Sequence, residues 1–465
     1  MIAGILAGYS SSAKSWPACF SIFLSGRAVG LPRIAIALTF ATWLAPKCRA
    51  ESPMEWVEQE IPQLTQIYES LHQAPELSFQ EEQTAARMAE LMRAEGLRVT
   101  TQVGGHGVVA VLENGEGKTL LLRADMDGLP VPEDTGLAYA SKVKVPNQRG
   151  ITVGVMHACG HDMHMTNLIG TVRYMVSARD AWQGTLVAIF QPAEERGAGA
   201  KAMIADGLLV RFPRPHYALA LHVAADSPAG SLGYRAGYAQ ANVDSVDITV
   251  NGRGGHGAYP EATVDPVVIA ARLVVDLQTI VSREIAPIQP AVVTVGSIHG
   301  GTKHNIIGDT CQLQLTVRSY SPAVRQQLIA AIRRKALAAA ASADAPAPTI
   351  SVSEGTPALY NDPDLVNRLV PALQQALGSE NVEEIEPSMG GEDFGRIGGA
   401  GVPIVMFKLG AVSQARLDQF RETGAPPPSL HSPKFYPDPA ATITTGVTAL
   451  ATAALDLLQP QDESP

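Results

Sequence analysis

Short apolar runs alternate with helix-like stretches through most of the chain. Four of these runs are β-rich and almost continuously hydrophobic: VVAVLEN (108–114), TLLLRAD (119–125), TLVAIFQP (185–192) and YALALHV (217–223). Such runs are typical of central strands in a sheet that helices cover on both faces. Two helices over 54–98 precede them, while a helix near 363–377 and a strand at 402–410 resume the pattern. The pattern predicts an α/β fold.

A different rhythm occupies 242–355. The expected elements are a strand at 243–252, a helix at 265–283, strands at 291–298 and 311–318, a helix at 322–342 and a strand at 349–354. This βαββαβ order is that of a small ferredoxin-like α+β domain. We therefore expect a catalytic domain in two parts, 51–241 and 356–465, with an inserted domain at 242–355.

The first 50 residues have the pattern of an export signal. Arg27 and Arg33 precede the apolar run 34–45, and a small residue, Ala50, follows. The run is shorter than the roughly 20 residues that a transmembrane helix needs. We expect a signal peptide at about 27–50 and an exported, periplasmic protein without membrane contact after cleavage. An uncleaved membrane anchor is the alternative.

Composition limits the classes of partner and the redox chemistry. The chain is 46% hydrophobic and 17% charged, with a formal net charge of −10. No stretch is dense in Lys and Arg, so the sequence does not favour a nucleic-acid partner. Of four cysteines, Cys19 and Cys48 fall in the signal segment, leaving Cys159 and Cys311. Two distant cysteines imply no disulfide framework.

The decamer MHACGHDMHM (156–165) is the densest cluster of candidate metal ligands. Cys159 and His161 stand two positions apart, and a thiolate with an imidazole suits zinc or a similar transition metal. Further donors follow predicted strands or lie in a late Pro-rich loop: Glu194, Glu195, His222 and His431. Alone, His222 is better explained by a hydrogen-bonded core histidine, and His431 by a surface residue. Their combination with the decamer favours a metal site.

The pair Glu194–Glu195 follows a buried strand. Adjacent residues at a strand end point in different directions, so one carboxylate can bind metal while the other faces the bound water. A metal ion lowers the pKa of such a water from 15.7 toward about 7. A neighbouring carboxylate can then accept its proton and pass it to a leaving nitrogen. A solvated glutamate pair is the plain alternative.

Five motifs together resemble the amidohydrolase branch of the co-catalytic zinc peptidase superfamily. They are RADMDGLPV (123–131), MHACGHDMH (156–164), QPAEERGAGA (191–200), GRGGHGAYP (252–260) and GGEDFG (390–395). The branch includes hippurate hydrolases, N-acyl-amino-acid amidohydrolases and plant auxin-conjugate hydrolases. The resemblance runs in matching order from about 55 to 455. It implies a zinc-exopeptidase-like catalytic domain with an inserted lid or dimerisation domain.

The resemblance also assigns roles to single residues. It implies two divalent ions of zinc, manganese, cobalt or nickel. Cys159 would bridge them, and the other ligands would be His161, Glu195, His222 and His431. It makes Glu194 the general base and Asp127 a residue that orients a ligand. It has His256 polarise the scissile carbonyl, in its own subunit or across a homodimer formed through the inserted domain, and Asn305 hold the substrate. His304 and Gly308 depart from the family's pattern around Asn305.

The hypothesis from these observations is metal-dependent hydrolysis of a linear amide, that of an N-acyl amino acid with an acetyl, benzoyl or other acyl group. The products are a carboxylic acid and a free amino acid. A dipeptidase or carboxypeptidase acting on short peptides is one alternative, since it uses the same water and base. A non-catalytic periplasmic metal-binding protein is another, and the base at Glu194 argues against it.

Overall fold

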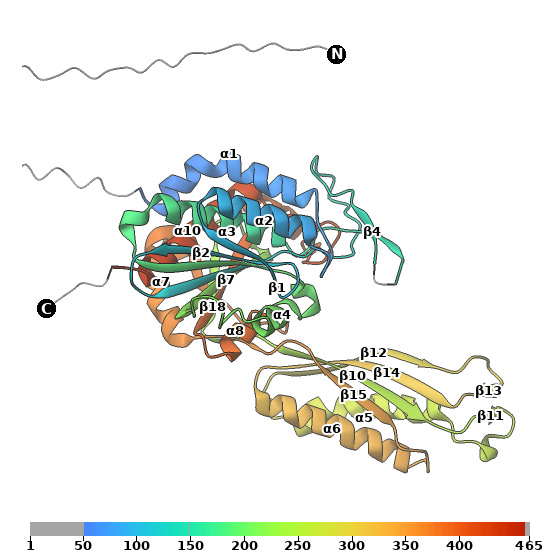
Figure 1. The fold of residues 1–465 in the computed structure, drawn as a ribbon. Coiled ribbons are helices and arrows are strands. Elements are labelled where there is room, and N and C mark those ends of the chain that lie inside the picture. Colours follow the sequence, from blue (N-terminus) through green and yellow to red (C-terminus); the bar gives the residue numbers. More distant parts are fainter. Residues whose placement is uncertain (1–50, 148, 461–465) are drawn as a thin grey trace, which may run out of the picture. The chain divides into compact units, whose positions relative to one another are not determined.

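The computed structural model describes residues 51–147 and 149–460, and the signal peptide expected at 27–50 lies outside them. Its largest element is an eight-stranded sheet in the order β1-β2-β6-β3-β7-β18-β8-β17 (Figure 1). The strands are β1 (Arg98–Val103), β2 (Gly107–Asn114), β3 (Thr119–Asp125), β6 (Gly184–Gln191), β7 (Tyr217–Pro228), β8 (Leu232–Tyr234), β17 (Val382–Glu384) and β18 (Ile404–Val412). Strands β6, β3, β7 and β18 are parallel neighbours. Their carboxyl ends therefore share one edge of the sheet.

Helices cover both faces of this sheet, as the apolar runs predict. One face packs against α2 (Glu82–Ala94), α3 (His161–Ser177), α7 (Pro363–Leu377) and α10 (Pro439–Leu457), and the other against α4 (Gly199–Ala205) and α8 (Gly395–Gly399). Along β3, Leu120 and Leu122 join the first core and Leu121 joins the second. This alternation explains why every position of β3 is buried. Each such side chain contributes roughly 1.5–3 kcal/mol when it leaves water.

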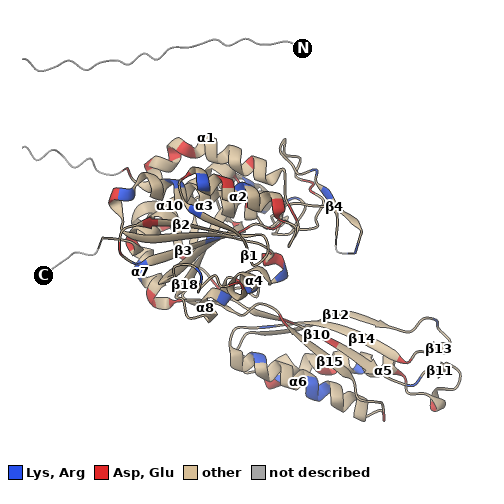
Figure 2. Cartoon of the chain, viewed as in Figure 1, with Lys and Arg blue, Asp and Glu red and all other residues tan. Residues whose placement is uncertain are grey.

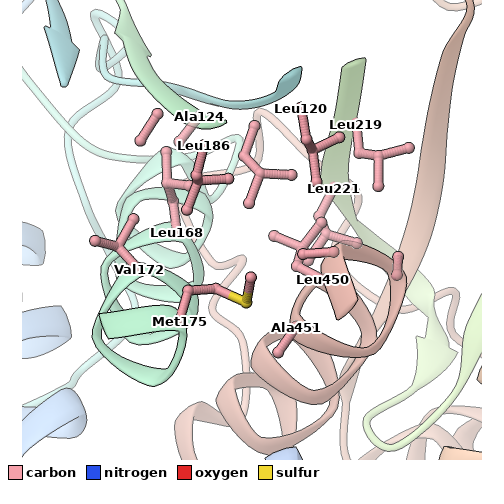
Figure 3. Close-up of a cluster of buried hydrophobic side chains, with 14 of the residues drawn as sticks. Leu120, Ala124, Leu168, Val172, Met175, Leu186, Leu219, Leu221, Leu450 and Ala451 are labelled. Carbon is pink, nitrogen blue, oxygen red and sulfur yellow. The ribbon is translucent and has the colours of Figure 1, made fainter. Parts of the chain in front are cut away.

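The core between the sheet and α3 and α10 is shown in Figure 3. Leu120, Leu186 and Leu221 from three neighbouring strands face Leu168 of α3 and Leu450 of α10. Helix α10 is long and apolar enough to cross a membrane by length and composition alone, but 67% of its apolar window is buried in the protein. It is a core helix. The outer helix α1 (Pro53–His72) packs on α3 and α10.

A second sheet has four antiparallel strands in the order β12-β14-β10-β15. These are β10 (Asn242–Asn251), β12 (Ala291–Gly300), β14 (Thr310–Ser319) and β15 (Thr349–Glu354), and they pack on α5 (Pro266–Thr279) and α6 (Pro322–Ala341). The predicted βαββαβ order is confirmed in β10, α5, β12, β14, α6 and β15. This region has its own hydrophobic core, separate from that of the large sheet. Its role as a lid or dimerisation domain stays a prediction.

Smaller elements complete the described chain. Two-stranded pairs are formed by β4 (Lys144–Pro146) with β5 (Thr152–Gly154), β9 (Gly237–Gln240) with β16 (Leu359–Asn361), and β11 (Gly255–His256) with β13 (Ile306–Ile307). The remaining helix and short turns are α9 (Gln414–Thr423), η1 (Arg179–Ala181), η2 (Glu194–Arg196), η3 (Pro260–Ala262), η4 (Ile280–Glu284) and η5 (Ser379–Asn381). Figure 2 shows acidic and basic residues scattered among the helices and loops of both regions.

Several predicted boundaries differ from those of the structure. The strand expected from 402 begins at Ile404, because Val402 and Pro403 precede it and proline has no N–H for a sheet bond. The helix expected to 283 ends its regular part at Thr279 and continues as the π-helical turn η4. His222, expected at a strand end, lies inside β7, which extends to Pro228.

Candidate metal centre and active site

The site forms where α3 begins, at the carboxyl edge of the large sheet. Gly160 is the N-cap of α3 with φ of 76°, and a Cβ there would lie 2.6 Å from a methyl group of Val223. Only glycine suits both the left-handed backbone and this close approach. The turn places Cys159 and His161 on either side of it. Both side chains are buried at the helix N-terminus, where the helix dipole favours a negative thiolate.

Cys159 is the point where distant parts of the chain converge. Its Sγ lies 3.6 Å from Nε2 of His222 and 3.3 Å from Nε2 of His431. His222 comes from β7, and His431 from the loop after α9. His431 has φ of 66°, and its backbone N–H donates to the carbonyl of Ala158 at 2.9 Å. It is therefore held beside the cysteine, although its side chain is about half exposed.

The five predicted ligands fall into two groups that share Cys159. Ligand atoms of Cys159, His161 and His222 lie within 4.8 Å of one another, and so do those of Cys159, Glu195 and His431. In the second group, Glu195 Oε1 is 3.3 Å from His431 Nε2. Two overlapping groups with one common sulfur have the donor arrangement of a two-ion centre with a bridging thiolate.

Orphaned polar atoms show that these residues fit metal ions. Among the described residues, both ring nitrogens of His161 and Oε1 of Glu195 are buried without a hydrogen-bond partner. Such atoms are rare in native proteins unless an ion or a water molecule satisfies them. Burial raises the pKa of the Cys159 thiol to about 12, so only a neighbouring cation would make it a thiolate at neutral pH. The donor set fits zinc and other divalent transition metals.

The histidine tautomers separate ligands from supports. His222 Nδ1 donates to the Val223 carbonyl at 2.8 Å, which leaves Nε2 free to face Cys159. His164 accepts the Val223 N–H on Nε2 at 2.9 Å and lies 2.6 Å from Asp125 through Nδ1. Both nitrogens of His164 are thus used. It is no free ligand, although it stands close to Asp125 and His161.

Asp127 positions three parts of the site at once. Its carboxylate accepts the backbone N–H groups of Glu194 and Glu195, each at 3.1 Å, and the Ser78 hydroxyl at 2.6 Å. Its Oδ1 is also 3.3 Å from Nδ1 of His161, although the two are not aligned for a hydrogen bond. The predicted orienting residue therefore contacts the predicted base, one predicted glutamate ligand and one predicted histidine ligand. It fixes them relative to one another.

Glu194 is buried beside the ligands. Burial, with the nearby carboxylates of Glu392, Asp393 and Glu195, raises its pKa. Divalent cations at the adjacent ligands would lower it again by favouring the ionised form. Arg123 is fully buried and pairs with Asp125 at 2.6 Å, Glu392 at 2.9 Å and Asp393 at 3.3 Å. This guanidinium holds the carboxylates behind the base in place.

A cavity of about 540 Å³ gives access to the site. Its lining includes Cys159, Glu194, Glu195, His222, His431 and Lys408. The sequence did not single out Lys408, Arg123, Asp125 or Glu392. Arg123 and Asp125 stand in the RADMDG motif and Glu392 in GGEDFG, so the motifs carried a signal. For Lys408 the signal was a lone charge inside the apolar strand predicted at 402–410. Burial lowers the pKa of Lys408, against the pull of Glu392 and other acidic groups.

Two predicted residues lie apart from this cluster. His256 is in β11 and Asn305 stands just before β13, and both are exposed. His256 Nδ1 accepts the N–H of Ala258 at 3.0 Å, and the Asn305 carbonyl accepts the N–H of Gly257 at 2.9 Å. In the described part of the chain, neither forms a hydrogen bond or ion pair with the ligand cluster. Their roles stay predictions.

The sequence was compared with protein families and known proteins. The model of peptidase family M20/M25/M40 matches residues 121–423. The chain belongs to this family. Thermostable carboxypeptidase 1 of Saccharolobus solfataricus is 36% identical over 72% of this chain and 82% of its own length. N-acetyl-L-cysteine deacetylase of Bacillus subtilis is 38% identical over 71% of this chain and 76% of its own length.

Solved structures share the fold of this M20 protein. An aminohydrolase from methicillin-resistant Staphylococcus aureus has a TM-score of 0.77 and 32% identity, covering 87% of this chain and 99% of that one. A dinuclear metal-binding M20 peptidase of Bacillus subtilis has a TM-score of 0.69 and 28% identity, covering 86% and 99%. The resemblance seen in the sequence is confirmed.

These findings define the class of enzyme. The protein is a metal-dependent amidohydrolase of the M20 family. The two ligand groups and the dinuclear relative support two divalent ions. The non-catalytic alternative is therefore set aside.

Proposed function

We propose that this M20 enzyme hydrolyses the amide bond of N-acyl amino acids and releases a carboxylic acid and a free amino acid. The observation that carries the proposal is Glu194, a buried carboxylate beside two donor groups that share Cys159. Similar proteins include N-acetyl-L-cysteine deacetylase and N-acetyldiaminopimelate deacetylases, and an IAA-amino acid hydrolase of Arabidopsis thaliana. These names support an N-acyl amino acid as the class of substrate.

Five residues of the chain would hold the two ions. Cys159 would bridge them, with His161 and His222 on one ion and Glu195 and His431 on the other. Zinc, manganese, cobalt and nickel are the candidates, and a thiolate ligand favours the softer of them. When bound, such ions activate a water molecule and polarise the amide carbonyl.

In the proposed reaction, Glu194 transfers the proton. Its carboxylate accepts a proton from the attacking water as the oxygen adds to the amide carbon. It then delivers that proton to the nitrogen as the C–N bond breaks, so the amine leaves neutral. Asp127 keeps Glu194 in reach of both atoms, because it binds the backbone N–H groups of Glu194 and Glu195. General acid–base catalysis of this kind contributes typically ~10²–10⁴-fold.

The four-stranded region would supply further contacts. We assign to His256 the polarisation of the scissile carbonyl and to Asn305 a contact with the polar end of the substrate. A donor to the developing oxyanion is worth ~3–4 kcal/mol. We also propose a homodimer formed through residues 242–355, and export to the periplasm after cleavage near Ala50. Size-exclusion chromatography with light scattering tests the dimer, and N-terminal sequencing of the secreted protein tests the cleavage site.

The test of the proposed function is the Glu194→Gln variant. We expect it to keep two ions per chain and to lose at least ~100-fold in turnover of an N-acyl amino acid, because the amide cannot accept a proton. Metal analysis and steady-state kinetics measure both. Glu58→Gln, an exposed glutamate on α1, is the control and should behave as the wild type. Near-normal turnover by Glu194→Gln would exclude Glu194 as the base.

A second candidate function is exopeptidase action on short peptides. The similarity to thermostable carboxypeptidases 1 and 2 of Saccharolobus solfataricus favours it. Both reactions use the same base, so a substitution of Glu194 cannot distinguish them. A panel of N-acetyl and N-benzoyl amino acids and dipeptides can, because it compares the substrates directly. A higher kcat/KM for dipeptides than for every N-acyl amino acid would replace the proposed function with this one.

A further inference from the structure

Lys408 is a cation beside the metal ligands that no step above uses. It lies in β18, directly opposite His222 of the parallel strand β7. Residues in register on neighbouring parallel strands point to the same face, so the two side chains stand side by side. Met406 and Ala220 precede them on that face and belong to one hydrophobic core. The ammonium of Lys408 is therefore carried to the site by a rigid strand.

Two cavities meet at Lys408. One is the cavity of about 540 Å³ around the metal ligands. The other, which we name the side pocket, has about 720 Å³ and runs along residues 223–240, 383–388 and 426–430. Gln240, Ser388, Lys408 and Leu430 line both. A group bound at the metal ligands can thus extend past Lys408 into the side pocket.

The ammonium group has unused hydrogen-bonding capacity. With its side-chain amide oriented to donate to the Gly391 carbonyl, Gln240 accepts one N–H of Lys408 at 3.0 Å. No carboxylate oxygen of the described residues lies within 4.0 Å of Nζ, so Lys408 forms no ion pair there. An ammonium has three donors. Glu392, Glu194 and Asp226 attract the ammonium only from beyond 4.0 Å, so an anionic ligand in direct contact would stabilise it further.

The side pocket suits the acyl end of a substrate. Its size is within the roughly 300–1,000 Å³ of small-molecule sites. Much of its lining is apolar, with Val223, Leu359, Ile385, Met406 and Leu430. None of its lining residues comes from 242–354, the region that carries His256 and Asn305. Those two residues are assigned to the scissile carbonyl and the substrate's polar end, which leaves the side pocket for the acyl chain.

The pocket's acidic residues do not cancel the charge of Lys408. Asp226, Glu383 and Glu386 also line it, but all three are exposed. Water and salt screen exposed charges, whereas Lys408 is only partly exposed and stands where the two cavities meet. Among the residues that line both cavities only Lys408 is charged, so the charge at their junction is positive.

We propose that the side pocket receives the acyl group and that Lys408 selects acyl groups bearing a carboxylate, as in N-succinyl amino acids. This rests on the proposed function for the identity of the scissile bond. The carboxylate of a succinyl group would pair with the Lys408 ammonium, while a neutral group of the same shape leaves that ammonium unpaired. Hydrogen bonds between charged groups are strong enough for about 10-fold or greater selection.

The experiment compares matched substrates on the metal-loaded enzyme. N-succinyl-L-methionine is set against N-(4-methylpentanoyl)-L-methionine, in which a branched alkyl end replaces the carboxylate at similar shape. We expect kcat/KM to favour the succinyl substrate at least ~10-fold in the wild type, and Lys408→Met to reduce that ratio at least ~10-fold. Lys144→Met, an exposed lysine of β4, is the matched control and should keep the wild-type ratio.

Three results would overturn the proposal. The first is equal kcat/KM for the two substrates in the wild type, and the second is an unchanged ratio of kcat/KM in Lys408→Met. The third is a preference that follows charge on the amino-acid side instead, which is measured with N-acetyl-L-glutamate against N-acetyl-L-glutamine. The wild-type ratio decides even if Lys408→Met fails to fold.

Binding separates this proposal from the proposed function. Calorimetry with the metal-loaded Glu194→Gln variant measures the affinity for both matched substrates without turnover. The side-pocket proposal is supported if the succinyl compound binds more tightly than the alkyl compound and Lys408→Met removes this difference. That conclusion holds even if the wild type hydrolyses neither compound. Equal binding with normal hydrolysis rejects the side pocket and leaves the proposed function standing.

Discussion

The carboxyl edge of the large sheet and the β11–β13 strand pair both carry residues assigned to one reaction, yet they are built differently. At the sheet edge, Cys159, His161 and Glu194 are buried, and Asp127 contacts the second and third of them. In the strand pair, His256 and Asn305 are exposed, and their hydrogen bonds among the described residues stay within this pair and its flanking loops. One region has its geometry fixed by packing, and the other does not.

The difference teaches where preorganisation comes from. Buried polar groups must find partners, so a network such as Asp127 with its three contacts is held in one arrangement. Exposed groups can satisfy themselves with water and keep their rotamer freedom. We therefore expect substitutions at the sheet edge to change metal binding and turnover, and substitutions in the β11–β13 strand pair to change turnover alone.

The largest effect is expected for Cys159→Ala. Removing the shared ligand should leave at most one ion per chain. The transition state then loses several kcal/mol of charge stabilisation, which corresponds to a loss of about 10³-fold in turnover. Metal analysis after dialysis measures the first and kinetics the second. The control is Cys311→Ala, a buried cysteine in the core of the four-stranded region, which should keep both ions. Full metal content in Cys159→Ala would remove Cys159 from the ligands.

A smaller effect is expected for Asp127→Asn. The amide keeps the shape but loses the charge that faces His161, and loss of such a supporting contact costs ~10–100-fold in metal affinity or activity. Titration of the metal-free protein with zinc measures the affinity. Asp309→Asn removes a charge that accepts the Gly254 N–H near the β11–β13 strand pair, and it should leave the affinity unchanged. If both variants bind zinc equally, the proposed contrast between the regions is wrong.

His256→Ala should keep both ions and lose about 10-fold in kcat. This is less than the ~100-fold of a rigid oxyanion donor, because an exposed side chain reaches the substrate only part of the time. His299→Ala, an exposed histidine of β12, serves as the control. Loss of metal in His256→Ala would contradict the assignment and move His256 into the centre.

The smallest effect on activity, and a distinct one on stability, is expected for His72→Gln. Burial opposes a charge on His72, but hydrogen bonds to Asp162 at 2.6 Å and Glu133 at 3.0 Å raise its pKa to about 10. The folded protein therefore holds this proton more tightly than the unfolded chain. Its contribution is complete below pH ~6.5 and is lost as the pH rises toward 10, on the order of 5 kcal/mol.

Urea unfolding of the metal-loaded protein at pH 6, 8 and 9.5 measures this dependence. The wild type should lose stability with rising pH, and His72→Gln should show a flatter profile from a lower starting point. Arg325→Gln breaks an ion pair with Asp244 in the four-stranded region, and arginine does not titrate in this range. It should shift the profile without flattening it. Parallel profiles in wild type and His72→Gln would show that His72 is neutral in the fold.

Much of the fold was predictable because its buried strands are short apolar runs. The strands β2, β3, β6 and β7 and the βαββαβ order follow from the hydrophobic pattern. Helices α3 and α10 were not predicted, because both are buried nearly all round, with residues such as Thr166 and Asn167 in the core. Such helices lack the polar face that makes a helix visible in a sequence.

The candidate ligands were predictable in identity, since cysteine, histidine and glutamate clustered after strands. Their supports were less so. Lys408 stands out in the sequence only as the one charged residue of the apolar run 402–410, and its place opposite His222 follows only from the pairing of β7 with β18. The hydrogen bonds that exclude His164 as a ligand depend likewise on where Val223 and Asp125 meet it.

The order of apolar and polar residues alone determined the α/β architecture, the βαββαβ segment and which side chains could bind metal. The tertiary structure decided which of those side chains share one site. Cys159 meets His222 from 63 positions away and His431 from 272 positions away. No local pattern contains such distances, because they result from strand register, a left-handed turn at His431 and the packing of α3 on the sheet.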